Sequence, residues 1–172
     1  MLISCSTETI EQSEQFYVPF NAKVQDKNLD QRIEPLVFKY FDMIAHLAEG
    51  DSVALQEQGL FFIQLTDSLA SMNSSNDSLM QAITTQGLMN LKAEMSAILL
   101  EEAHSERLFG VNMLSLHLIQ FLASIGYEKQ LLYIYADTEE QHWISNRKKA
   151  KNPYLQNSER LYEANQVLQE LR

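Results

Sequence analysis

Residues 35–52 read PLVFKYFDMIAHLAEGDS, and their pattern recurs along much of the chain. The apolar residues follow one another every three or four positions, at Leu36, Val37, Tyr40, Phe41, Ile44, Leu47 and Ala48. That spacing places them on one face of a helix, with Pro35 in the first turn, where its missing N–H costs little. Gly50 ends the helix, and Asp51 and Ser52 can cap the next one. The stretch therefore predicts an amphipathic helix followed directly by a second.

The second helix is expected over about residues 52–72, with apolar residues again at helical spacing. The polar run 73–78 has the composition of a loop. Asp77 or Ser78 at its end can cap a third helix.

Helical spacing then persists over residues 79–125. One helix of that length would measure roughly 70 Å, which exceeds a small domain. We therefore expect a break, either at Gly87 or within residues 102–105. Gly126 ends the helical part.

The remaining residues are less regular. Residues 131–135 are rich in Tyr, Leu and Ile and favour an extended segment. Residues 142–154 show no periodicity, and a final helix is expected over about 156–171. Helices joined by short connections pack as antiparallel bundles. The predicted fold is all-α, an up-and-down four-helix bundle with a short extended or irregular segment and a C-terminal helix.

The chain has 172 residues and a formal net charge of −10. Its length suits one domain, so we expect residues 1–30 to form a tether or extended segment and residues 31–172 to form a single helical-bundle domain. The acidic balance argues against a nucleic-acid partner, since phosphates bind to broad basic surfaces. No apolar run approaches the roughly 18 residues that span a bilayer.

The only cysteine is Cys5, in the sequence Leu2-Ile3-Ser4-Cys5. Leu-Ile-Ser-Cys fits the cleavage pattern of bacterial lipoproteins, in which the cysteine receives lipid. Such a signal also needs an apolar stretch of about 7–15 residues, and only four residues precede Cys5; a start of translation further upstream would explain this. We expect a lipid anchor at Cys5, which would be the chain's one link to a membrane. The alternative is an incidental cysteine in a cytosolic N-terminus.

Residues 142–154 read HWISNRKKAKNPY and hold the only tryptophan, a run of positive charge and an Asn-Pro-Tyr turn. Proline disfavours helix at the residue before it, so a turn is expected here. Trp143 and Tyr154 are predicted to anchor the segment to the bundle through their rings. The cations between them, Arg147 to Lys151, are expected to form a solvated loop, with an acidic partner as the alternative.

The order of these features resembles the domain of unknown function 3347. This periplasmic helical domain also forms the C-terminal part of some copper/silver efflux adaptor subunits. The resemblance spans about residues 33–160 and rests on Arg107, Phe109, Trp143, Ser145, Asn152, Pro153 and Tyr154. It implies the scaffold and a periplasmic setting.

The chain departs from that family at the sulfur ligands. Ala136, Asp137 and Thr138 stand where the family has Cys-Pro-Met, and residues 159–162 stand where it has a later cysteine. A soft Cu(I) site needs thiolates or thioethers. The metal role of the family is therefore not expected to carry over.

Two Glu-x-x-His pairs, Glu101–His104 and Glu139–His142, have the spacing of di-iron ligands on a helix. The carboxylates that such a site needs from other helices are not available in the usual order, so coincidence is favoured. His104 is predicted to be a core histidine. His142, with Asp137, Glu139 or a neighbouring glutamate, suggests a weaker site for Zn or Cu(II).

No set of nucleophile and base stands out, so an enzyme is not expected. The first hypothesis is a non-enzymatic, periplasmic, lipid-anchored helical bundle that binds a protein partner or a small ligand, with no resident cofactor. A Zn- or Cu(II)-binding protein built on His142 and a cytosolic scaffold that self-associates are the alternatives. The identity of the ligand and the oligomeric state stay open at this point.

Overall fold

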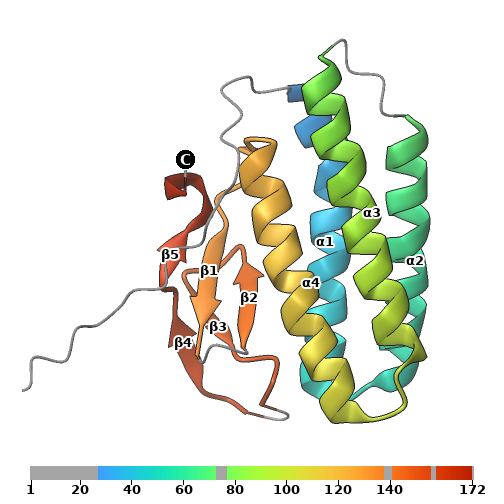
Figure 1. The fold of residues 1–172 in the computed structure, drawn as a ribbon. Helices are drawn as coiled ribbons and strands as arrows, with labels where there is room; N and C mark the ends of the chain where they lie inside the picture. Colours follow the sequence, from blue (N-terminus) through green and yellow to red (C-terminus); the bar gives the residue numbers. More distant parts are fainter. Residues whose placement is uncertain (1–26, 73–76, 138–140, 156–157, 172) are drawn as a thin grey trace, which may run out of the picture.

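Figure 1 shows a bundle of helices with a small region of strands packed beside it. The computed structural model describes residues 27–72, 77–137, 141–155 and 158–171. Within these residues the helices are α1 (Lys27–Glu49), α2 (Ser52–Ser71), α3 (Ser78–Leu100) and α4 (His104–Ser124). Each helix packs on the next one along the chain, as the short connections predict.

The prediction of a purely helical chain is wrong, because the C-terminal region forms short antiparallel strands. One sheet has the order β2-β1-β5, and the other consists of β3 and β4. Their bounds are β1 (Tyr133–Ala136), β2 (His142–Ser145), β3 (Lys149–Lys151), β4 (Leu161–Glu163) and β5 (Gln166–Val167), followed by the 3-10 turn η1 (Leu168–Glu170). The four-helix bundle and the extended segment near 131–135 are confirmed.

Helix α1 begins at Lys27, so Pro35 lies inside the helix and not in its first turn. The predicted boundary at residue 31 is therefore placed too late. Leu29 and Ile33 are buried, 5% and 0% exposed, and extend the apolar stripe ahead of the proline. Burying two such side chains contributes roughly 1.5–3 kcal/mol each, which offsets the cost of about 3 kcal/mol for an internal proline.

The long helical stretch breaks after Leu100, and α4 begins at His104. Of the two predicted positions, the one within 102–105 is confirmed. Gly87 instead lies in the middle of α3. A Cβ atom there would lie 2.2 Å from Cδ2 of Phe121, so the glycine lets the ring of α4 approach the α3 backbone.

The predicted C-terminal helix over 156–171 is wrong because the backbone of this segment pairs with earlier strands. The N–H groups of Ala164 and Asn165 donate to the carbonyl oxygens of Lys148 and Ile134. These long-range hydrogen bonds override a local apolar spacing that also fits a helix. For the same reason residues 142–154 contain β2 and β3 and are not irregular throughout.

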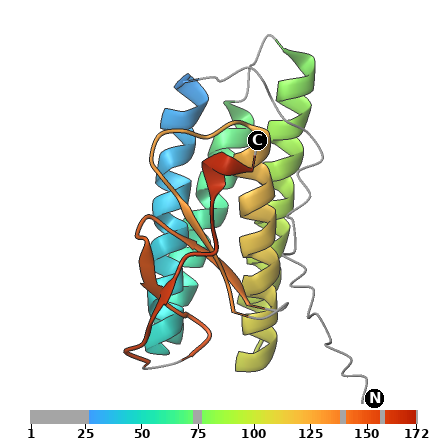
Figure 2. The same ribbon diagram turned by 90° about the vertical axis from the view of Figure 1, so that its left-hand side faces the viewer.

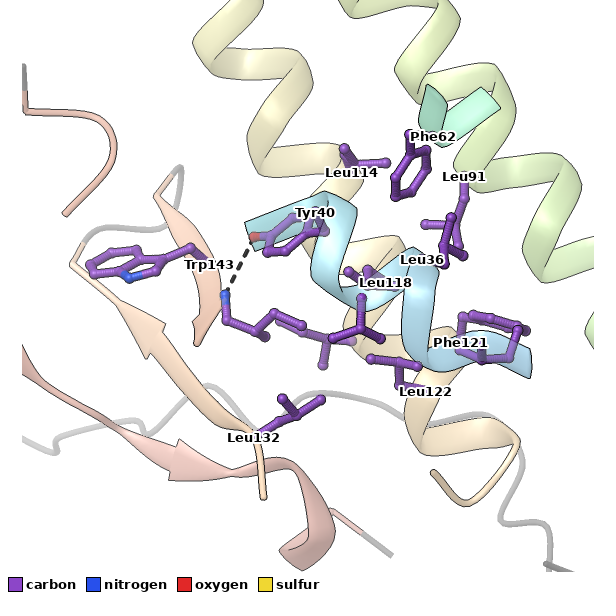
Figure 3. Packing of buried hydrophobic residues seen from close by; sticks show 14 of the residues in the cluster. Leu36, Tyr40, Phe62, Leu91, Leu114, Leu118, Phe121, Leu122, Leu132 and Trp143 are labelled. Atoms are coloured by element: carbon purple, nitrogen blue, oxygen red, sulfur yellow. Dashed lines mark hydrogen bonds between the residues drawn. The ribbon is translucent and has the colours of Figure 1, made fainter. Parts of the chain in front are cut away.

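Strand β2 lies at the seam between α1 and α4, and Figure 2 shows the strands crossing in front of these two helices. The backbone N–H of Ile144 donates to the Tyr40 hydroxyl at 3.3 Å, the dashed line in Figure 3. That hydroxyl lies 2.7 Å from Oγ of Ser115, which donates to the carbonyl of Val111. Since Ser115 gives its proton to Val111, Tyr40 is the donor to Ser115. The chain of bonds ties β2, α1 and α4 together inside the core.

Replacing Tyr40 by Phe removes the shared hydroxyl and leaves the Ile144 N–H buried without its acceptor. We expect Tyr40→Phe to lower the free energy of unfolding by about 1–3 kcal/mol, measured by urea denaturation with an unchanged slope. Tyr133→Phe is the matched control, because the half-buried Tyr133 hydroxyl has no hydrogen bond among the described residues. Equal effects of the two variants would contradict this role of Tyr40.

Candidate functional site

A groove of about 720 Å³ lies between the C-terminal half of α1 and strands β2 and β3. Its lining also includes Pro153, Leu155, Ser158, Glu159 and Leu161. Its volume is within the range of small-molecule sites, which is about 300–1,000 Å³. Its volume is twice that of a second groove, of about 360 Å³, between α3 and α4.

Helix α1 supplies an apolar wall because it carries a second apolar flank. One flank is buried in the bundle through Leu36, Val37, Tyr40, Met43 and Leu47. The other faces the groove through Phe38, Phe41, Ile44, Ala45 and Ala48. Phe38 is 45% exposed and meets Phe41 edge to face, with 6.4 Å between ring centroids. This wall leaves aromatic surface in contact with water.

The opposite wall contains an aromatic cluster centred on Trp143. Its indole stacks on the Tyr135 ring, with 4.9 Å between the ring centroids and 9° between the ring planes. The rings of Tyr154 and Tyr162 meet the indole edge to face, with centroid distances of 6.1 and 6.0 Å. Trp143 and Tyr154 are 1% and 8% exposed, as expected of anchors for this segment. Because β2 alternates its side chains, Trp143 lies on the sheet face away from Tyr40.

The Asn-Pro-Tyr turn is held to the β1–β2 hairpin by hydrogen bonds. Oδ1 of Asn152 accepts from the N–H of Tyr154 at 2.8 Å. Nδ2 of Asn152 donates to Asp137 at 3.0 Å and to Gln141 at 3.1 Å. The Tyr154 hydroxyl donates to the carbonyl of His142 at 2.6 Å. The turn is thus a rigid part of the groove wall.

The cationic run is not a solvated loop, because part of it is strand β3 and two of its lysines are paired. Lys149 lies 2.8 Å from Glu163 and Lys151 lies 2.8 Å from Glu159. Hydrogen bonding to Glu163 raises the pKa of Lys149, and the reverse contact lowers the pKa of Glu163. These pairs hold β3 to β4 and to the segment before it.

Arg147 differs from these lysines. Its N–H donates to Oγ of Ser145 at 3.2 Å, and its carbonyl accepts from the Tyr135 hydroxyl. The backbone is therefore held from two sides. The guanidinium, in contrast, makes no hydrogen bond or ion pair within the described ranges, although Arg147 lines the groove.

The predicted metal ligands do not form a site in the part of the chain that the structure describes. Glu139 lies outside those residues, and Asp137 is exposed and accepts from Asn152. No group of three or more His, Cys, Asp or Glu side chains able to hold a metal ion occurs among the described residues.

His142 is 3% exposed and faces α4. Its backbone N–H and its Nδ1 lie 2.9 and 3.0 Å from Oδ1 of Asn112. The backbone N–H fixes the amide with its oxygen toward the strand, so Nδ1 must carry the ring proton. His104 was predicted to be a core histidine, but it is exposed in the first turn of α4. The buried side chains of α4 begin further along the helix, at Val111. The histidine in the core is His142.

The other residues of the family resemblance lie apart from the groove. Nε of Arg107 donates to the carbonyl of Glu101 at 2.7 Å and so caps the end of α3. Phe109 is 55% exposed on α4. Cys5 lies outside the described residues.

Sequence reasoning missed the polar residues that seat the strand. Tyr40 was assigned only to the apolar face of its helix, and Ser115 and Asn112 were not singled out. A hydroxyl or amide at a core position of a helix was the available signal, since such a group needs a partner from another element.

Models of known protein families, curated proteins and solved structures were compared with the chain, and none of them matches it. The resemblance to the domain of unknown function 3347 therefore stays a prediction. In the described parts of the chain, no helix combines the length and the apolar character needed to cross a bilayer.

Four buried tyrosines predict loss of stability in alkali. Burial raises the pKa of Tyr40 and Tyr154 above the ordinary value and that of Tyr127 and Tyr135 to about 12. Unfolded tyrosines titrate near pH 10, so the folded state favours the neutral form. The contribution of these tyrosines to the free energy of unfolding should stay constant below about pH 10 and decrease as the pH rises through about 12.

Urea denaturation at about pH 8 and about pH 11 measures this difference. Tyr40→Phe, which has one buried phenol fewer, should lose less stability between the two pH values than the unmodified chain. A stability that stays constant or increases over this interval would refute the assignment.

Proposed function

We propose that this protein is a non-enzymatic binding domain whose groove between α1 and β2–β3 holds a small apolar ligand. The observation that carries the proposal is a groove of small-molecule size whose α1 wall leaves the rings of Phe38 and Phe41 partly exposed. Covering apolar surface contributes about 25 cal/mol per Å². A ligand with an apolar body gains this energy without any rearrangement of the bundle.

A binding role is favoured over a catalytic one by the chemistry of the lining. Its polar side chains include Ser145, whose hydroxyl accepts from the N–H of Arg147. A serine becomes a useful nucleophile when a base accepts its proton. The described lining residues include neither histidine nor cysteine.

We also propose that the domain is a periplasmic relative of metal-efflux accessory domains that has lost their sulfur ligands. Residues of the resemblance support this, since Trp143 packs edge to face on Tyr154, whose N–H donates to Asn152, and Trp143 and Pro153 line the groove. Next to it, Asp137 stands at a position of the family's sulfur motif and accepts from Asn152. A hydrogen-bonded turn thus takes the place of soft ligands.

The compartment is tested by metabolic labelling with a palmitate analogue. The full-length gene product, expressed with its own upstream sequence, should carry label, and Cys5→Ser should carry none. Absence of label from the unmodified protein would remove the lipid anchor from the proposal.

The groove is tested by filling it. Ala45 is an exposed groove residue on α1, and Ala45→Phe should weaken binding of octanol and octanoate by about tenfold, or about 1.4 kcal/mol. Ala93→Phe is the control, because Ala93 is exposed on α3 and lines none of the described cavities. Calorimetry and the fluorescence of Trp143, the only tryptophan, report binding.

The proposal fails if neither compound binds to the unmodified protein. It also fails if Ala45→Phe and Ala93→Phe have the same effect on the affinity.

A further inference from the structure

We infer that the groove selects an apolar ligand with one acidic group, a medium-chain or aryl carboxylate, and that Arg147 binds this group. The inference rests on the proposed binding function and adds the chemical class of the ligand. It follows from which charged side chains around the groove already have an ion-pair partner and which do not.

The cations of the rim are not equivalent. Lys149 and Lys151 lie in the lining, but each is 2.8 Å from a glutamate oxygen. Binding an anion there would compete with an ion pair that holds β3 to β4 or to the segment before β4. Arg147 is the lining cation whose charge has no partner in the described part of the chain.

The acidic side chains of the lining do not compensate Arg147. Asp42 lies 3.1 Å from Lys39, and Glu159 lies 2.8 Å from Lys151. Glu49 is 71% exposed and lies 3.8 Å from His46 on its own helix. The positive charge of Arg147 is therefore available to a ligand.

Arg147 is also prepared for a carboxylate by its surroundings. The Tyr135 hydroxyl and the Ser145 Oγ hold its backbone, which reduces the entropy lost on binding. A guanidinium presents parallel N–H groups that match the two oxygens of a carboxylate. Tyr135 also stacks on Trp143, so the cation and the aromatic wall are parts of one unit.

A second donor without a partner belongs to Trp143, which is a residue of the same lining. The Trp143 indole N–H is buried and has no hydrogen-bond partner among the described residues. Both this group and the guanidinium donate, and carboxylate oxygens accept. A ligand head that accepts hydrogen bonds is therefore favoured over an amine or ammonium head.

The net charge of the chain favours a ligand with one acidic group over a polyanion. A net charge of −10 repels nucleic acids and anionic lipid surfaces, which need several cations at once. One acidic group beside an apolar groove needs a single cation. Apolar contact then supplies the remaining affinity.

The test compares octanoate, octanol and octylammonium, which share one chain and differ in the head. Each is titrated into the full chain and followed by calorimetry and Trp143 fluorescence. Octanoate should bind about tenfold more tightly than octanol, and octylammonium should bind more weakly than either. Arg147→Gln should lower the affinity for octanoate about tenfold, to about that for octanol.

Lys148→Gln is the matched control, because Lys148 has the same charge, is the next residue and does not line the groove. It should keep the preference for octanoate. Equal binding of octanoate and octanol by the unmodified protein, or equal effects of Arg147→Gln and Lys148→Gln, would overturn the inference but leave the proposed function intact. If none of the three compounds binds to the unmodified protein, both the inference and the proposed function are overturned.

Discussion

The buried polar seam between β2 and helices α1 and α4 is the constraint on which the rest of the structure depends. A strand pressed against helices hides backbone N–H groups from water, and each must find a partner. The Tyr40 hydroxyl accepts a hydrogen bond from the N–H of Ile144, and the Asn112 amide oxygen accepts one from the N–H of His142. Two polar side chains on the buried faces of α1 and α4 therefore set the register of the strand. A slip by one residue would turn Trp143 toward the helices and leave both acceptors unmatched.

That register also produces the groove. With His142 and Ile144 turned toward the bundle, Trp143 lies on the outer face of β2, where Tyr135, Tyr154 and Tyr162 surround it. This cluster holds β3 and β4 in place through Tyr162, which lies opposite Ala150. Short strands cover only part of α1, so its second apolar flank lies across the groove from β2 and β3.

The sequence predicts those parts of the fold that depend on local pattern. Apolar spacing locates the four helices, and the length limit on 79–125 requires the break that follows Leu100. Strands β3 and β4 are not predictable in this way. Their residues alternate only between exposed and half-buried, and Leu161 and Leu168 fit a helical spacing equally well. What decides between helix and strand is pairing with residues distant in the chain.

The same limit applies to the site. Arg147, Lys149 and Lys151 belong to one cationic run in the sequence, and only the positions of Glu163 and Glu159 separate the paired lysines from the arginine. His142 illustrates the reverse. Its residue type suggests a metal ligand, yet its N–H, Nδ1 and carbonyl are all engaged with Asn112 and Tyr154. Residue type ranks the candidates, but the partners that folding supplies decide which of them remain available for a ligand.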